Sequence, residues 1–139
     1  MASRLNPYLS FRNNARQAMD FYKSVFGGEL TVSTFGEGGM AQDPSDKDKI
    51  MHSQLETPAG FTVMGADTPA GMEHNPGTNI AISLSGDDGD ALRGYWEKLS
   101  DGGTVSVPLE KQMWGDEFGM CVDRFGIGWM VNIAAPTES

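Results

Sequence analysis

The chain has 139 residues, a length typical of a single domain. Nineteen acidic against ten basic residues give a net charge of −9, which opposes contact with nucleic acids and anionic membrane surfaces. One cysteine excludes an internal disulfide, and no apolar run reaches the ~18 residues of a membrane span, so we expect a cytoplasmic protein.

The first half of the chain predicts a strand, a helix and three further strands. Apolar residues recur at helical spacing until the pair Gly27 and Gly28, which suits a helix end. The apolar stripe consists of Ala15, Ala18, Met19, Tyr22, Val25 and Phe26. The predicted strands are 5–11, 29–35, 49–56 and 61–66.

The second half repeats this order. A strand at 78–84 precedes a helical stripe of Leu92, Tyr95, Trp96 and Leu99, with Ser85 or Asp87 as the expected N-cap. Strands are predicted at 104–111, 117–122 and 127–134. The pattern predicts an α+β fold of two tandem βαβββ units, about 4–67 and 77–135, in one domain over 1–139.

Two long loops interrupt the pattern. Residues 67–77 are rich in proline and glycine, which is typical of a linker. Residues 36–49 are polar and glycine-rich, and a loop of this length is a lid, a partner-binding segment or a mobile segment. No glycine-rich phosphate loop, nucleophile elbow or Cys-x-x-Cys motif occurs, so we expect no nucleotide cofactor.

The strand at 49–56 carries the clearest polar candidates. Its alternation places His52, Gln54 and Glu56 on one face. This face could hold a metal, although the other histidine, His74, lies in a loop. Alternatively His52 acts as a general acid or base, and it is the first choice for a catalytic residue.

Three aspartates lie near predicted turns. Asp67 ends a strand, where it either faces a pocket mouth or bonds the Thr-Pro turn that follows. Asp123 is expected to bond its own turn, in which Gly126 supplies a positive φ, and Asp116 is interpreted in the same way.

Apolar candidates gather near the C-terminus. Trp114 precedes a turn, where its ring either caps a cavity or packs in the core, and Phe118 follows on the next strand. Met64, Met120 and Met130 offer either a deformable ligand lining or ordinary core packing. Cys121 is expected to be a buried, inert thiol, with a Cys–His nucleophile involving His52 as the alternative.

Five segments in order carry a family resemblance: "NPYLSF", "FYKSVFGGEL", "IMHSQLE", "VMGAD" and "MWGDEFGMCVDRFGIGW". They resemble the PhnB-like branch of the vicinal oxygen chelate superfamily, which includes glyoxalase I, bleomycin-resistance and extradiol dioxygenase proteins. The resemblance implies that the two units form a curved, barrel-like sheet around a cavity. It also implies a homodimer.

The resemblance places the superfamily's metal ligands, within about one residue, on Pro7, Met64, Asn79 and Met130. These residues make a poor shell for a hard metal ion, so we expect no metal cofactor. The expected function is binding of a small organic ligand by His52, Gln54, Met64, Asp67, Trp114, Phe118 and Met130.

Three other functions compete with ligand binding. One is a metal-dependent lyase or dioxygenase, and another is a metal-free enzyme that uses His52 as acid or base. A third is the methyltransferase activity with which PhnB-like proteins are sometimes labelled. That activity is not favoured, because "RNNARQ" after the first strand contains no glycine for an S-adenosylmethionine site.

Overall fold

The computed structural model describes residues 3–41 and 43–135 as two compact units, Met1–Pro76 and Gly77–Ser139. The first unit contains β1 (Tyr8–Phe11), α1 (Ala15–Phe26), β2 (Glu29–Thr34), a short 3-10 helix (Pro44–Asp46), β3 (Ile50–Glu56) and β4 (Thr62–Asp67). The second contains β5 (Ile82–Gly86), α2 (Gly89–Ser100), β6 (Thr104–Lys111), β7 (Glu117–Val122) and β8 (Gly128–Ile133). The predicted α+β fold of two βαβββ units is confirmed.

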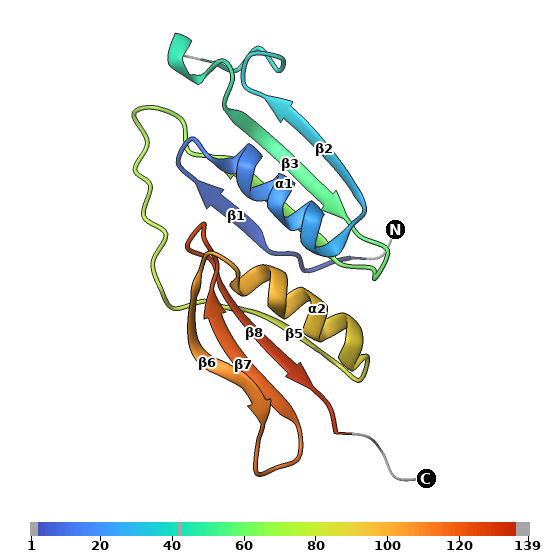
Figure 1. The fold of residues 1–139 in the computed structure, drawn as a ribbon. Helices are drawn as coiled ribbons and strands as arrows, with labels where there is room; N and C mark the ends of the chain where they lie inside the picture. Colours follow the sequence, from blue (N-terminus) through green and yellow to red (C-terminus); the bar gives the residue numbers. More distant parts are fainter. Residues whose placement is uncertain (1–2, 42, 136–139) are drawn as a thin grey trace. The chain divides into compact units, whose positions relative to one another are not determined.

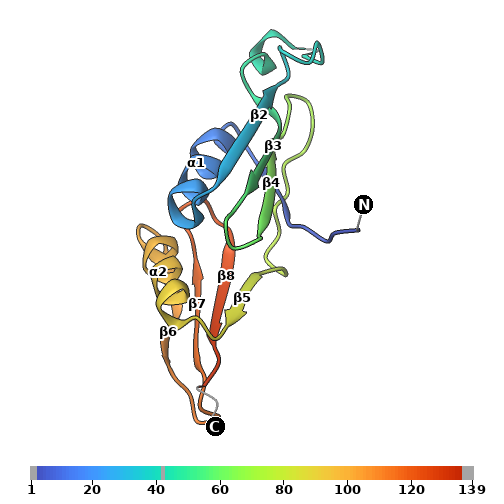
Figure 2. The same ribbon diagram turned by 90° about the vertical axis from the view of Figure 1, so that its right-hand side faces the viewer.

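Each unit is a four-stranded mixed sheet with one helix on one side (Figures 1 and 2). The strand order is β1-β4-β3-β2 in the first unit and β5-β8-β7-β6 in the second. The first strand of each unit runs parallel to the last, and the other neighbours are antiparallel. The joint barrel-like sheet and the single domain over 1–139 stay predictions.

Helix α1 packs against its sheet through the predicted stripe, all six residues of which are buried. The helix ends at Gly27, whose φ is 73°, and the next residue must also be glycine. A Cβ on Gly28 would lie 2.0 Å from the carbonyl oxygen of Glu56, and φ there is 102°. The double glycine therefore allows β2 to start directly beside the end of β3.

Two predicted boundaries in the second unit were wrong. The strand expected at 78–84 is Ile82–Gly86, because its parallel partner β8 begins only at Gly128, and Ile82 pairs with Trp129. Residues 78–81 precede this ladder. The helix N-cap is Asp88, neither Ser85 nor Asp87, and its side chain accepts a hydrogen bond from Ala91 N.

The loop 36–49 is attached at its base. Phe35 N and Gly36 N donate to the carbonyl oxygens of Lys49 and Lys47 at 3.1 and 2.9 Å. The buried Asp46 carboxylate accepts hydrogen bonds from Ala70 N. It also forms an ion pair with Lys49, whose Nζ is 2.8 Å from Oδ1. Asp46 thus joins this loop to the 67–77 segment.

Candidate functional site

In the first unit, the sheet has one face under α1 and one face away from it. Phe11, Ser53, Leu55 and Val63 are buried, and a Cβ on Gly65 would lie 3.0 Å from Met19 Sδ of α1. Alternation and strand register place the other side chains on the opposite face. We call this the polar face, and its residues are Tyr8, Ser10, Thr31, Ser33, His52, Gln54, Glu56, Thr62, Met64 and Ala66.

The predicted residues His52, Gln54 and Met64 lie together on the polar face. Gln54 pairs with Met64, and Tyr8 pairs with Met64 from the other side. The Tyr8 hydroxyl lies 3.5 Å from His52 Nδ1, and the ring centroids are 5.9 Å apart. Sequence reasoning missed Tyr8, although the alternation in "PYLSF" already separates it from Leu9 and Phe11.

Glu56 is occupied by other partners on this face. Its Oε1 accepts a hydrogen bond from Gln54 Nε2 at 3.0 Å and lies 3.8 Å from Arg4. His74 instead interacts with the Thr68 hydroxyl at 3.2 Å from Nδ1. Among the described residues, no three His, Cys, Asp or Glu side chains gather closely enough to hold a metal ion.

Asp67 lies on the helix side of the sheet, opposite the polar face, and lines a hollow of about 560 Å³ there, so its role in ligand binding stays a prediction. Its side chain is 6% exposed. Oδ1 accepts from Ala15 N and Oδ2 from Ile50 N, both at 2.9 Å. Since Asn14 makes no side-chain cap, Asp67 serves the start of α1 in its place. Its partners differ from the Thr-Pro turn considered as the alternative.

In the second unit, the face away from α2 carries five apolar side chains beside polar ones such as Ser83, Glu110 and Asn132. Gly119 marks the helix side, because a Cβ there would lie 2.8 Å from Trp96 of α2. The neighbouring positions of β7 therefore point the other way, and β8 and β6 follow by register. We call this the apolar face, and its apolar residues are Val107, Phe118, Met120, Val122 and Met130.

Aromatic rings meet at one end of the apolar face. Trp114 lies in the β6–β7 loop, is 62% exposed, and has its ring centroid 6.4 Å from that of Phe118. Asn132 pairs with Phe118 and donates to Asp116 Oδ2 at 3.1 Å. Asp116 Oδ1 also accepts from Ala135 N, and these two hydrogen bonds lower the pKa of Asp116. The prediction that the Asp116 side chain bonds its own turn was wrong, because its two acceptors face the end of β8.

A cavity of about 300 Å³ lies at the other end of this face. Met120, Val122 and Gly128 contribute from the sheet, and Ile80 and Ala81 contribute from the segment before β5. The polar residues of the lining are Thr78, Asn79 and Ser106. Its volume is at the lower end of the range for small-molecule sites. Met130, which pairs with Met120, lies between this cavity and the aromatic pair.

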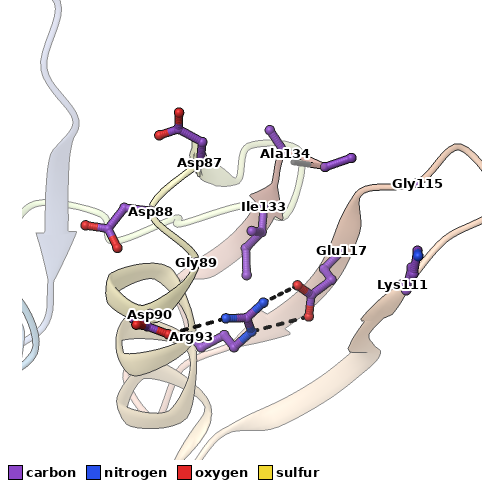
Figure 3. A pocket seen from close by; sticks show the side chains of 11 residues that line it. Asp87, Asp88, Gly89, Asp90, Arg93, Lys111, Gly115, Glu117, Ile133 and Ala134 are labelled. Carbon is purple, nitrogen blue, oxygen red and sulfur yellow. Dashed lines mark hydrogen bonds and ion pairs between the residues drawn. The ribbon is translucent and has the colours of Figure 1, made fainter. Parts of the chain in front are cut away.

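A larger hollow of about 880 Å³ lies on the helix side of the second unit (Figure 3). Figure 3 shows Arg93 reaching from α2 to Glu117 on β7, with Asp90 on its other side. The pairing with Glu117 raises the pKa of Arg93. Because its guanidinium is already matched by two carboxylates, we do not place the ligand site here.

Two other predicted roles are confirmed. Asp123 is 3% exposed and bonds its own turn through Phe125 N and Ile127 N, with Gly126 at φ 89°. Cys121 is buried on the helix side of β7, and burial, followed by the charge of Asp123, raises its pKa to about 11. A thiol in this state is a poor nucleophile.

The residues at the superfamily's metal positions do not fit a hard ion. In the described sheets, Met64 is paired with Tyr8, the residue after Pro7, and Met130 is paired with Ser83. Asn79 precedes β5 and stands outside the ladder. Thioethers and neutral hydroxyls cannot supply the carboxylate and imidazole donors that such a site requires.

Comparison with solved structures supports the fold. The chain is 34% identical to protein PA1353 from Pseudomonas aeruginosa over 97% of this chain and 100% of that one, with a TM-score of 0.81. A putative 3-demethylubiquinone-9 3-methyltransferase, PhnB protein, from Bacillus cereus is 21% identical over 95% and 100%, with a TM-score of 0.75. A glyoxylase/bleomycin resistance protein/dioxygenase domain from Frankia is 14% identical over 96% and 98%, with a TM-score of 0.63.

Neither α1 nor α2 is long and apolar enough to cross a membrane.

The family model described as 3-demethylubiquinone-9 3-methyltransferase matches residues 3–132, nearly the whole chain. The chain therefore belongs to this family, and its fold is like that of the PhnB protein from Bacillus cereus and of the glyoxylase/bleomycin resistance protein/dioxygenase domain from Frankia.

Proposed function

We propose that the protein binds a small, partly apolar organic molecule on the apolar face of its second unit. The supporting observation is the combination of five apolar side chains on three adjacent strands with a cavity of about 300 Å³. The helix of this unit lies on the other side of the sheet (Figure 2). Val122 on this face is 40% exposed, so removal of its side chain from water would favour binding.

The residue types favour an irregular ligand. Met120 and Met130 have unbranched, polarisable side chains that adapt to different shapes. Phe118 and Trp114 add rigid rings on which a flat group can stack. No metal contributes to this proposal, because the donor set at the superfamily's metal positions does not suit one.

Binding can be tested with the neutral fluorescent dye Nile red on the full chain. We expect a rise in dye fluorescence and a change in tryptophan emission. Met130→Lys should weaken dye binding by at least about tenfold, because it places a charge in the apolar face. Met113→Lys is the control, since Met113 is 99% exposed in the nearby loop. Equal binding by both variants, or no binding by the unmodified protein, would contradict the proposal.

A metal-free acid–base activity is the second candidate function. The observation that favours it is the 3.5 Å approach of the Tyr8 hydroxyl to His52 Nδ1. In this arrangement His52 accepts a proton from a carbon acid through Nε2, while Tyr8 orients the ring through Nδ1. Thr31 and Ser33 on β2 extend the polar surface beside it.

Proton exchange tests this second candidate. Enolisable ketones and aldehydes are incubated with the protein in D₂O, and loss of the α-proton signal is followed by NMR. We expect His52→Gln to abolish the protein-dependent exchange and Tyr8→Phe to lower it about tenfold. Thr62→Val, which is on the same face but opposite Glu56, should leave it unchanged. Exchange that is equally fast with His52→Gln would exclude this role.

The methyltransferase named in the family description is not the function proposed here. The turn after β1, residues 12–14, contains no glycine, and α1 starts directly afterwards. The sheets of the described units are mixed, with parallel pairing only between β1 and β4 and between β5 and β8. A methyl-transfer assay with S-adenosylmethionine is expected to give no product with this chain.

We also propose that the protein is a cytoplasmic homodimer. Apolar residues such as Leu5, Ile80 and Val105 are exposed, and their burial would favour association. The lone, buried Cys121 requires no oxidising compartment. Light scattering should give about twice the 15.0 kDa mass of one chain at micromolar concentration, and a monomer mass would contradict the dimer.

A further inference from the structure

Carboxylates flank the aromatic end of the apolar face. Phe118 on β7 is opposed by Glu110 on β6, so both side chains leave the sheet on the same side. On the other side Phe118 is opposed by Asn132, which holds the Asp116 carboxylate at 3.1 Å. With Trp114 6.4 Å from Phe118, a pair of rings is flanked by two acidic residues.

Within the described part of the second unit, no basic side chain on the same face offsets these charges. Lys111 is the nearest basic residue in sequence, but in the strand register it is opposite Glu117, so its side chain leaves the sheet on the helix side. The Glu117 carboxylate forms an ion pair with Arg93 of α2. Figure 3 shows Arg93, Glu117 and Lys111 around the hollow on the helix side. These basic groups therefore belong to the opposite side of the sheet.

The other basic residues of the second unit also lie elsewhere. Arg124, in the β7–β8 turn, donates to the Asp101 carbonyl at 2.9 Å, and Lys98 is in the last turn of α2. Within residues 77–135, which the structure describes, none of the four basic residues is on the apolar face. An anionic ligand would thus meet Glu110 without a compensating cation.

We propose that the ligand of the apolar face is an organic cation, a protonated or quaternary amine attached to an apolar body. This inference rests on the proposed function and adds the ligand class. The ammonium group lies over the rings of Trp114 and Phe118, whose π faces attract cations, and near the Glu110 carboxylate. The apolar body extends along Met130 and Met120 toward the cavity of about 300 Å³.

A pair of probes of equal shape tests the ligand class. The cation is (4-hydroxybenzyl)trimethylammonium, and the neutral isostere is 4-neopentylphenol, in which carbon replaces the charged nitrogen. Binding to the full chain is followed by NMR of the methionine methyl groups and the tryptophan indoles. We expect the cation to bind about tenfold more tightly than the isostere. Added salt should weaken binding of the cation and leave binding of the isostere unchanged.

Substitutions locate the charge effect. Glu110→Gln should weaken binding of the cation about fivefold and leave the isostere unchanged. Glu97→Gln removes the same charge from an exposed position on α2 and should leave both affinities unchanged. Phe118→Leu keeps an apolar side chain but removes the ring, so it should weaken binding of the cation more than binding of the isostere.

The outcomes separate the two proposals. If the isostere binds as tightly as the cation and still shifts the Met120 and Met130 methyl signals, the cation inference is wrong and small-molecule binding on this face stands. If neither probe nor Nile red perturbs these methyl groups, the proposed function itself fails. An equal loss of cation affinity in Glu110→Gln and Glu97→Gln would reduce the effect to net charge and overturn the inference.

Discussion

The indole of Trp129 donates a hydrogen bond from Nε1 to Oδ2 of Asp123 at 2.8 Å in the core of the second unit. Trp129 is on the strand that follows the turn, and Asp123 starts the turn. The other carboxylate oxygen accepts from Phe125 N and Ile127 N. One buried carboxylate thus fixes both the turn and the largest fully buried side chain.

Asp123→Ala should destabilise the protein by about 3 kcal/mol, because it leaves one buried and two half-buried donors without this acceptor. Urea unfolding followed by circular dichroism measures the change. The control is Asp101→Ala, which removes an exposed ion pair to Arg124 and should cost less than about 1 kcal/mol. Similar losses in both variants would contradict the special role of Asp123.

Asp67→Asn should also destabilise, by about 2 kcal/mol. Its two oxygens accept from Ala15 N and Ile50 N, and the amide would direct an NH₂ group toward one of these donors. Because Asp67 is on the helix side, the folded variant should bind Nile red as the unmodified protein does. Normal stability combined with lost dye binding would support the role that the sequence suggested for Asp67.

Local patterns predicted much of this molecule. Alternation along residues 49–56 placed His52, Gln54 and Glu56 on one face, and helical spacing found the buried stripe of α1. Both patterns depend only on neighbours in sequence.

Pairings between distant strands could not be predicted in the same way. The approach of Tyr8 to His52 joins residues 44 apart, and Asp67 reaches Ala15 across 52 positions. The start of β5 depends on where β8 begins, which the residues before Ile82 do not reveal. The division into a polar face and an apolar face follows only after such register is known.

Cys121 should react slowly with thiol reagents in the native protein. Its pKa is raised to about 11, so at pH 8 only about one thiol in a thousand is ionised. Reaction with a disulfide reagent should accelerate strongly in urea, where the ordinary thiol pKa returns. As folding raises this pKa, the corresponding stability is present below pH 9 and is lost as pH rises toward 11. Rapid native labelling at pH 8 would contradict burial.

The Asp116–Asn132 pair should show the opposite pH dependence. Hydrogen bonds from Asn132 and then Ala135 N lower the pKa of Asp116, so its stabilisation is present above the ordinary aspartate pKa and is lost as pH falls through the lowered value. Asn132→Ala should raise the Asp116 pKa, as measured by carboxyl carbon NMR during an acid titration.

Two glycines of the second unit should respond in opposite directions to the same change. A Cβ on Gly119 would lie 2.8 Å from the Trp96 ring and 2.9 Å from Leu109 Cα. Gly119→Ala should therefore destabilise by about 1–3 kcal/mol through overpacking between β7 and α2. Gly94 is inside α2 with open space around its Cβ position, so Gly94→Ala should stabilise by about 0.5–1 kcal/mol. Thermal unfolding of the two variants gives the signs directly, and an unchanged midpoint for Gly119→Ala would mean that α2 packs less closely on β7 than the structure shows.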